Sequence, residues 1–79
     1  MAKYKVGDLV RINNNAEDYE VIVRETGLTH EDIGIITKFV TGHYTKTVGG
    51  KPIIHRDWYE VLFSTQQVLD FEEWEIESL

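Results

Sequence analysis

The chain has 79 residues, a net charge of −6 and no cysteine. This length allows one domain, and the absence of cysteine excludes disulfides and thiolate metal sites. An excess of acids repels phosphate backbones unless the cations gather on one face, which disfavours general nucleic-acid binding.

The composition predicts a soluble, folded protein. Apolar residues make up 42% of the chain, enough for one compact core. The first residues contain no apolar targeting region, and no window is as long and apolar as a membrane span. We therefore expect a cytoplasmic location and no membrane association.

The segment Tyr4–Ile12 predicts a tight turn followed by a strand. Gly7 can adopt a positive φ without strain, and the Asp8 side chain can hydrogen-bond the backbone of the turn. Val6 and Val10 are expected on the inward face of the strand that follows.

A long first connection follows, over residues 13–32. Asn13–Asp18 is polar and turn-prone. Tyr19–Gly27 allows two interpretations. Early acids, Arg24 near the end and a closing glycine are typical of a helix, but three consecutive β-branched residues favour an extended arm, which we prefer. Thr29 and Asp32 then predict one capped turn.

Further strands are predicted in the rest of the chain. Gly34–Val40 has the spacing of a strand, and its glycine predicts a bulge or a close backbone approach. Trp58–Phe63 is the clearest strand, and Val68–Phe71 and Glu75–Leu79 complete the set. Short strands joined by tight turns predict an all-β, five-stranded barrel as a single domain over residues 1–79.

A β-hairpin is predicted between two of these strands. Gly49-Gly50 supplies the positive φ values of a type I′ turn, and centring on it pairs Tyr44 with His55. The arms are Thr41–Val48 and Lys51–Asp57. Because their sequence is polar, we expect this ribbon to project from the core.

The predicted core combines aliphatic and aromatic side chains from these strands. The residues expected to point inward are Val6, Val10, Ile36, Phe39, Tyr59, Val61, Phe63 and Phe71. Trp58, Tyr44, Tyr19 and Trp74 are less easily placed inside, so they are candidates for interface contacts.

Four segments in order resemble SH3-like barrels: KVGDLVRI, DIGIITKF, YEVLF and DFEEWEIESL. The pattern is similar to the photosystem I accessory subunit PsaE, to the variable chain of ferredoxin–thioredoxin reductase, to KOW-type barrels and to small SH3-like proteins of phages and prophages. The resemblance implies a barrel without specifying an activity. The segments that it leaves out, 13–32 and 42–57, are connections of the kind on which function usually resides.

No pattern in the sequence predicts catalysis or a cofactor. Nucleophile motifs, nucleotide-binding glycine loops and metalloprotease signatures are absent. His30, His43 and His55 lack a compact ligand spacing, so no metal site is expected. We therefore expect a protein that is not an enzyme.

The preferred function is an interaction module or accessory subunit that binds a protein partner. The predicted partner-binding residues are Tyr44, Lys46, Lys51, His55, Arg56 and Trp58. Two alternatives remain open: nucleic-acid binding of the KOW type through the same ribbon, and an acidic inhibitor or decoy that uses Asp70–Glu77. The simpler interpretation is that these acids lie on the solvent side of a strand and turn and have no binding role.

Overall fold

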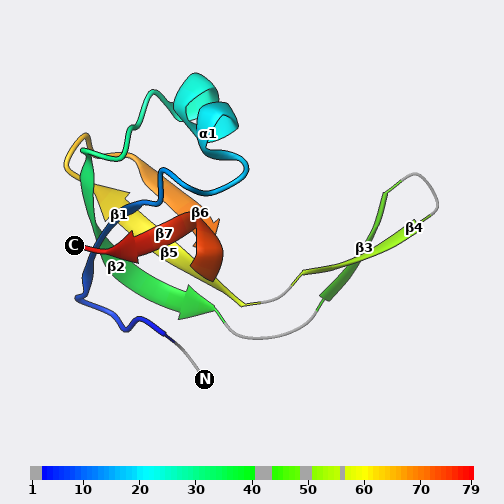
Figure 1. The fold of residues 1–79 in the computed structure, drawn as a ribbon. Helices are drawn as coiled ribbons and strands as arrows, with labels where there is room; N and C mark the ends of the chain where they lie inside the picture. The colour runs from blue at the N-terminus through cyan, green and yellow to red at the C-terminus, as the bar shows by residue number, and fades with distance from the viewer. Residues whose placement is uncertain (1–2, 41–43, 49–50, 56) are drawn as a thin grey trace.

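A computed structural model describes residues 3–40, 44–48, 51–55 and 57–79, with 44–48 and 51–55 described as backbone alone. The described part is mostly strand with one short helix, so the all-β prediction is confirmed (Figure 1). In chain order the elements are β1 (Leu9–Ile12), α1 (Tyr19–Thr26), β2 (Ile33–Val40), β3 (Tyr44–Val48), β4 (Lys51–His55), β5 (Trp58–Phe63), β6 (Val68–Glu72), the 3₁₀ helix η1 (Glu73–Glu75) and β7 (Ile76–Ser78).

Five strands form one antiparallel sheet in the order β6-β5-β2-β1-β7. The first and last strands of this order, β6 and β7, are the sheet edges, and η1 connects them. The sheet is therefore open over the described residues, and closure into a barrel stays a prediction.

The opening turn forms as predicted. Gly7 has a φ of +97°, the Lys5 N–H donates to Asp8 Oδ2 at 2.9 Å, and the Asp8 N–H donates to the Lys5 carbonyl at 3.0 Å. The inward placement of Val6 is wrong, because its side chain is 62% exposed. The turn separates Val6 from β1, so the inward alternation of the strand begins only at Val10.

Residues 19–26 form a helix, so the preferred extended interpretation is wrong. Glu20 in the first turn and Arg24 in the last complement the helix dipole. Gly27 ends α1 in the left-handed conformation, and its N–H donates to the Val23 carbonyl at 2.8 Å. Burial of Ile22 adds tertiary stabilisation, which outweighs the few tenths of a kcal/mol that each β-branched residue costs in a helix.

The capped turn after α1 is confirmed. The Thr29 N–H donates to Asp32 Oδ2 at 2.8 Å, and the Asp32 N–H donates to the Thr29 carbonyl at 3.0 Å. His30 joins this turn to its surroundings, because its N–H donates to the Tyr19 hydroxyl and its Nδ1 lies 2.8 Å from the Ile12 carbonyl.

The bulge predicted for Gly34 does not lie at this residue. Gly34 pairs in register with Phe63, and the register of β2 with β5 shifts further along the strand, between Ile36 and Lys38. A close approach does occur at Gly34, but it is to side chains of β5 and not to backbone. A Cβ atom on Gly34 would collide with the Val61 side chain and lie 3.1 Å from the Phe63 ring. The glycine therefore lets β2 and β5 side chains pack closely at the start of the strand.

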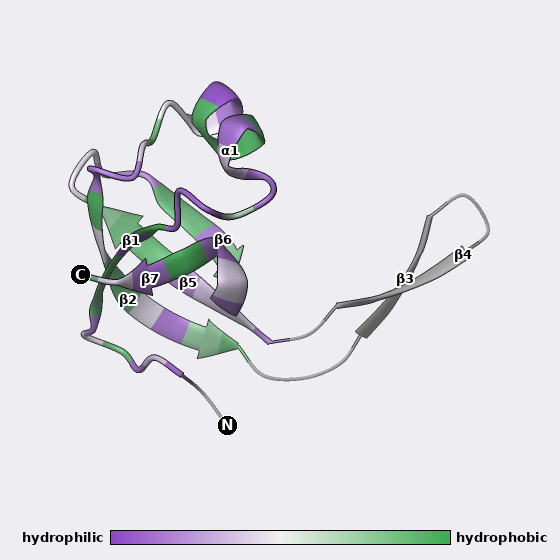
Figure 2. Ribbon diagram, viewed as in Figure 1, coloured by the Kyte–Doolittle hydropathy of each residue, from purple (hydrophilic) through white to green (hydrophobic). Residues whose placement is uncertain are grey.

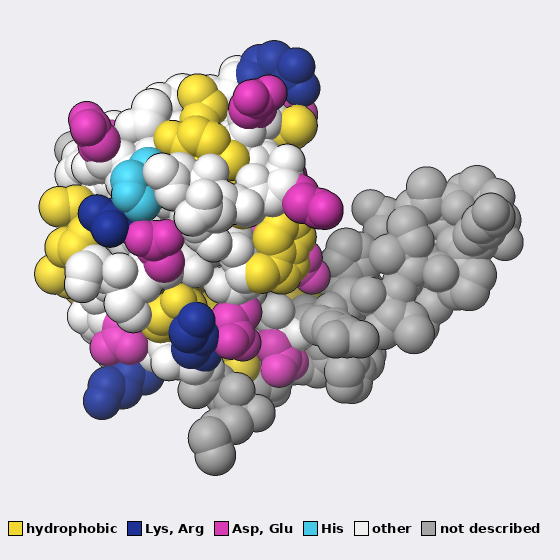
Figure 3. Space-filling view, viewed as in Figure 1, with side chains coloured by type: hydrophobic (Ala, Val, Ile, Leu, Met, Phe, Trp, Pro, Cys, Tyr) yellow, Lys and Arg dark blue, Asp and Glu magenta, His cyan; other side chains and the backbone are white. Residues whose placement is uncertain are grey.

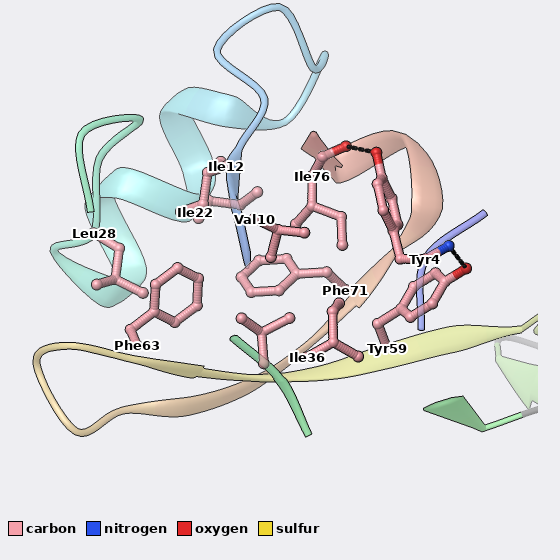
Figure 4. Close-up of a cluster of buried hydrophobic side chains, with 11 residues drawn as sticks. Tyr4, Val10, Ile12, Ile22, Leu28, Ile36, Tyr59, Phe63, Phe71 and Ile76 are labelled. Carbon is pink, nitrogen blue, oxygen red and sulfur yellow. Dashed lines mark hydrogen bonds between the residues drawn. The ribbon is translucent and has the colours of Figure 1, made fainter. Parts of the chain in front are cut away.

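The core lies against the inward face of the sheet and under α1 (Figure 4). Its buried members are Tyr4, Val10, Ile12, Ile22, Leu28, Ile36, Tyr59, Val61, Phe63, Phe71 and Ile76. Of the predicted members, Phe39 is partly buried and lies 4.8 Å from the Tyr59 ring.

Two tyrosines satisfy backbone groups at one end of the core. The Tyr59 hydroxyl accepts from the Lys3 and Tyr4 N–H groups at 3.0 and 3.1 Å. The Tyr4 hydroxyl donates to the Ile76 carbonyl at 3.3 Å. Two of these bonds are drawn in Figure 4, and they fasten the N-terminal segment to β5 and β7.

Strands β3 and β4 form a separate two-stranded sheet in the predicted register. Tyr44 pairs with His55, and Val48 pairs with Lys51. Figure 1 draws this ribbon away from the five-stranded sheet, as its polar sequence predicts. The predicted arms extend beyond β3 and β4 into residues 41–43 and 56, which lie outside the described part, as do residues 49–50.

Candidate functional site

Most of the predicted partner-binding residues lie on the ribbon, where only the backbone is described. Tyr44 and Lys46 belong to β3, and Lys51 and His55 belong to β4. Arg56 lies outside the described residues. The four described positions share one two-stranded ribbon, but how their side chains are grouped stays a prediction.

Trp58 is the one predicted partner-binding residue whose side chain is described. It begins β5, is half-buried, and pairs in register with Val40 on one side and Glu72 on the other. It therefore belongs to the five-stranded sheet, at the end nearest the ribbon.

The sheet displays a line of exposed aliphatic side chains on the face opposite the core. Leu9 pairs with Ile35, Ile35 with Leu62, and Leu62 with Val68, so one side chain from each of four neighbouring strands stands in direct register. Their exposed fractions are 50%, 37%, 38% and 54% along the line. We call these four residues the apolar row.

The apolar row arises because the strands are apolar on both faces at this end of the sheet. Val10, Ile36 and Phe63 alternate with row members and are buried on the other face. Figure 2 shows hydrophobic residues along β1, β2 and β5, with a hydrophilic position near the end of β2. A sheet with one solvated face normally alternates apolar with polar residues, so this row is a departure from that pattern.

Two more aliphatic residues extend the exposed apolar surface. The Leu79 N–H donates to the Leu9 carbonyl at 3.2 Å, which places the chain end beside the row, and its side chain is 55% exposed. Ile33 precedes Ile35 by two residues on the same face and is 43% exposed. In Figure 3, hydrophobic side chains gather at the edge of the molecule where Figure 1 marks the C-terminus.

Three acids stand beside the row on the same face of β5 and β6. Two residues along the strands from the pair Leu62–Val68 is the pair Glu60–Asp70. Two residues further is Glu72, which pairs with Trp58. We call Glu60, Asp70 and Glu72 the acidic flank. Like charges directly opposite each other in a sheet are unfavourable.

Partners within the chain offset part of the charge of the acidic flank. Lys38 is opposite Glu60 in the register, and the Thr37 hydroxyl donates to Glu60 Oε1 at 2.9 Å. The Trp74 Nε1–H donates to Glu72 Oε2 at 2.8 Å. With one lysine against three carboxylates, the net charge of this part of the face remains negative.

A second candidate site is a groove between α1, β6 and η1. Its volume is about 270 Å³. The apolar part of its wall comes from Val21, Ile22, Leu69 and Phe71, and the polar part from Asp18, Glu25, Thr26, Asp70 and Glu75. It separates the helix from the sheet edge.

Glu75 and Asp18 form an interacting pair of carboxyl groups in this groove. Burial, a hydrogen bond with Asp18 and the nearby charges of Asp18 and Glu72 together raise the pKa of Glu75 to about 8, while the Glu72 N–H, which donates to Glu75 Oε1 at 2.7 Å, opposes the shift. Asp18 Oδ1 is buried and has no hydrogen-bond partner among the described residues. A proton on the Glu75 carboxyl group would give it a donor.

The carboxyl pair could exchange a proton near neutral pH, but its contacts indicate a structural role. Asp18 precedes α1 and Glu75 ends η1, so a shared proton joins the helix to the last turn before β7. Perturbed acids occur in structural networks as well as in active sites. In the described part of the chain, no group of three or more His, Asp or Glu side chains is arranged to hold a metal.

Sequence reasoning missed both the apolar row and the carboxyl pair. A signal for the row was present, since DLVRI, DIGII and YEVLF place apolar residues at both odd and even positions. The pair had no such signal, because 56 residues lie between Asp18 and Glu75 and only the fold brings them together.

No helix among the described residues is long and apolar enough to cross a membrane. Comparison of the chain with protein-family models, curated proteins and solved structures gave no significant match.

Proposed function

We propose that this chain is a small non-catalytic interaction module that binds a protein partner through the apolar row. The supporting observation is the register of Leu9, Ile35, Leu62 and Val68, which aligns four exposed aliphatic side chains across four strands. Contiguous exposed apolar surface of this kind marks interaction sites, whereas scattered apolar residues need no explanation. Covering the row would remove it from water, which favours association.

The strand order supports the proposed SH3-like architecture. Strand β5 pairs with β2 on one side and β6 on the other, β1 and β7 complete the sheet, and the single turn η1 comes directly before the last strand. On this proposal the ribbon of β3 and β4 is an insertion between β2 and β5, which are neighbours in the sheet. The ribbon is then a second contact surface for the same partner, with Tyr44, Lys46, Lys51, His55 and Arg56 as its contact residues and Trp58 at the adjacent end of β5.

The experiment compares two variants in co-purification from an extract of the source cells. Ile35→Thr combined with Leu62→Thr makes the two central residues of the row polar and places threonine, which is common in strands, at both positions. Val6→Thr combined with Val21→Thr is the matched control, because it makes two other exposed aliphatic residues polar. We expect the control to retain the partner proteins of the wild type and the row variant to lose them.

Retention of the same proteins by a folded row variant would contradict the proposal. Circular dichroism and thermal unfolding test whether both variants are folded. This check distinguishes a loss of binding from a loss of structure.

Nucleic-acid binding through the ribbon is the second candidate function, and one observation favours it. Segment 41–56 contains three cations and no acid, so it has a charge of +3 within a chain of −6. A basic ribbon can contact phosphates while the acidic body points away. This candidate function predicts that the protein retains a labelled oligonucleotide at low salt, that retention falls as salt is raised, and that Lys46→Glu/Lys51→Glu abolishes it. If the wild-type protein does not retain the oligonucleotide at low salt, nucleic-acid binding is excluded.

A further inference from the structure

The apolar row and the acidic flank occupy one continuous face of the sheet. Along β5 and β6, the cross-strand pairs run from Leu62–Val68 through Glu60–Asp70 to Trp58–Glu72 on that face. An occupant of the row that extends along these strands therefore meets the acids next. Its chemistry must suit both parts.

We propose that this face binds a positively charged segment of another protein, with aliphatic side chains over the apolar row and lysine or arginine side chains at the acidic flank. This inference rests on the proposed function and specifies the partner. A cation placed between Glu60 and Asp70 would relieve the repulsion between two carboxylates that face each other across the strands. Complementary charge beside an apolar contact sets the register and the specificity of association.

The flank has capacity for such a cation. Asp70 is exposed, and Glu60 accepts from the Thr37 hydroxyl and stands opposite Lys38 in the register without a described salt bridge to it. Exposed carboxylates of this kind lose little hydration energy when a partner cation approaches. Their contribution is therefore mainly to orientation and selectivity, while the apolar row supplies most of the binding free energy.

A second copy of this chain is a poorer occupant of the face. Two copies joined through it would each bring the acidic flank and a net charge of −6 to the same interface. Accumulating like charge opposes association. A basic partner has the opposite balance, so the charge of the face favours it.

Two fluorescent peptides provide the test. One contains alternating leucine and lysine, and the other has glutamate in place of every lysine. We expect the lysine peptide to bind the full chain, the glutamate peptide not to bind, and the lysine peptide to shift the methyl NMR signals of Leu62 and Val68. Fluorescence anisotropy measures the dissociation constants.

Two double variants with equal charge changes separate a local contact from general attraction. Glu60→Gln with Asp70→Asn removes two acids from the flank, and Glu17→Gln with Glu20→Gln removes two exposed acids near α1. We expect the flank variant to weaken lysine-peptide binding about tenfold, equivalent to ~1.4 kcal/mol, and the control to change it less than twofold. Ile35→Thr with Leu62→Thr should weaken it at least as much.

Four results would overturn the inference. Equal weakening by the flank and control variants would show unspecific attraction. Weakening by the row variant alone would leave the proposed function intact and refute the basic partner. Dimerisation in sedimentation equilibrium, abolished by the row variant, would identify a second copy as occupant. A monomer that binds neither peptide would refute the basic partner, while co-purification would still decide the proposed function.

Discussion

At the scale of single residues, the Asp18–Glu75 pair is the feature with the clearest chemical consequence. Both groups are acids in a groove that α1 partly shields from water. In the folded chain the pKa of Glu75 is raised to about 8. In the unfolded chain the same group has its ordinary value of 4.5. Folding and protonation are therefore linked.

This linkage predicts that stability falls as the pH rises from about 4.5 to about 8. Between these pH values Glu75 is protonated in the folded state and ionised in the unfolded state. Below this pH range Glu75 is protonated in both states, and above the range it is ionised in both. Glu75→Gln keeps a donor for Asp18 and removes the titrating group. We expect urea unfolding of this variant to show a shallower loss of stability across that pH range than the wild type.

Glu73→Gln is the control for the pH experiment, because Glu73 lies on the same 3₁₀ helix and its side chain is exposed. It should retain the wild-type pH dependence. An unchanged slope in Glu75→Gln would contradict the assignment of the proton to this residue.

At the scale of elements, the helix α1 was the main error of sequence reasoning, and its cause is specific. The run Val21-Ile22-Val23 favours an extended chain locally, but Ile22 is 8% exposed in the fold and packs into the core. Gln67 Nε2–H also donates to the Thr26 carbonyl at 2.9 Å, which ties the end of the helix to the β5–β6 turn. Neither contact could be predicted from residues 19–26 alone.

Substitutions in α1 should follow helical and not extended chemistry. Ile22→Ala should lower the free energy of unfolding by about 2–5 kcal/mol, because it removes a buried side chain. Val21→Ala should be neutral or slightly stabilising, because Val21 is exposed and alanine is the better helix former. Chemical denaturation measures both, and a marked loss in Val21→Ala would contradict an exposed helical position.

Gly34 sets the contact between β2 and β5, and adding a methyl group there should destabilise the sheet. We expect Gly34→Ala to lower the free energy of unfolding by about 1–3 kcal/mol, the usual range for overpacking a core, because the new Cβ meets Val61 and Phe63. The double variant Gly34→Ala/Val61→Ala provides space for the methyl group. It should lose less than the sum of the two single variants; additive losses would show that the collision does not occur.

At the scale of the whole molecule, the ribbon differs from the rest of the chain both in charge and in its place outside the five-stranded sheet. All fourteen acids lie outside segment 41–56, which itself has a charge of +3, so the rest of the chain has a charge of −9. Val40 pairs with Trp58, so the strands that flank the ribbon are adjacent in the sheet. The five-stranded sheet is therefore complete without β3 and β4.

This arrangement predicts that the ribbon can be removed without loss of the fold. Replacing residues 41–57 by Asn-Gly joins Val40 to Trp58 through the turn that suits a two-residue hairpin. Shortening this connection reduces the entropy cost of closing it by about 2 kcal/mol, so stability should be retained within ~2 kcal/mol. Circular dichroism and urea unfolding test this, and an unfolded product would show that the ribbon supports the sheet.

The sequence alone determined those features that depend on neighbouring residues. The turn at Gly7, the capped turn at Thr29, the hairpin register and the strand Trp58–Phe63 all follow from local geometry, since a few adjacent residues supply both the dihedral preferences and the hydrogen-bonding groups. The tertiary structure decided what depends on residues distant in the chain. Burial of Ile22 turned an apparent extended arm into a helix, β1, β2, β5 and β6 aligned four aliphatic residues into one row, and the fold brought Asp18 to Glu75. Free energies of burial and of charge interaction are set by spatial neighbours, and only the folded chain determines which residues those are.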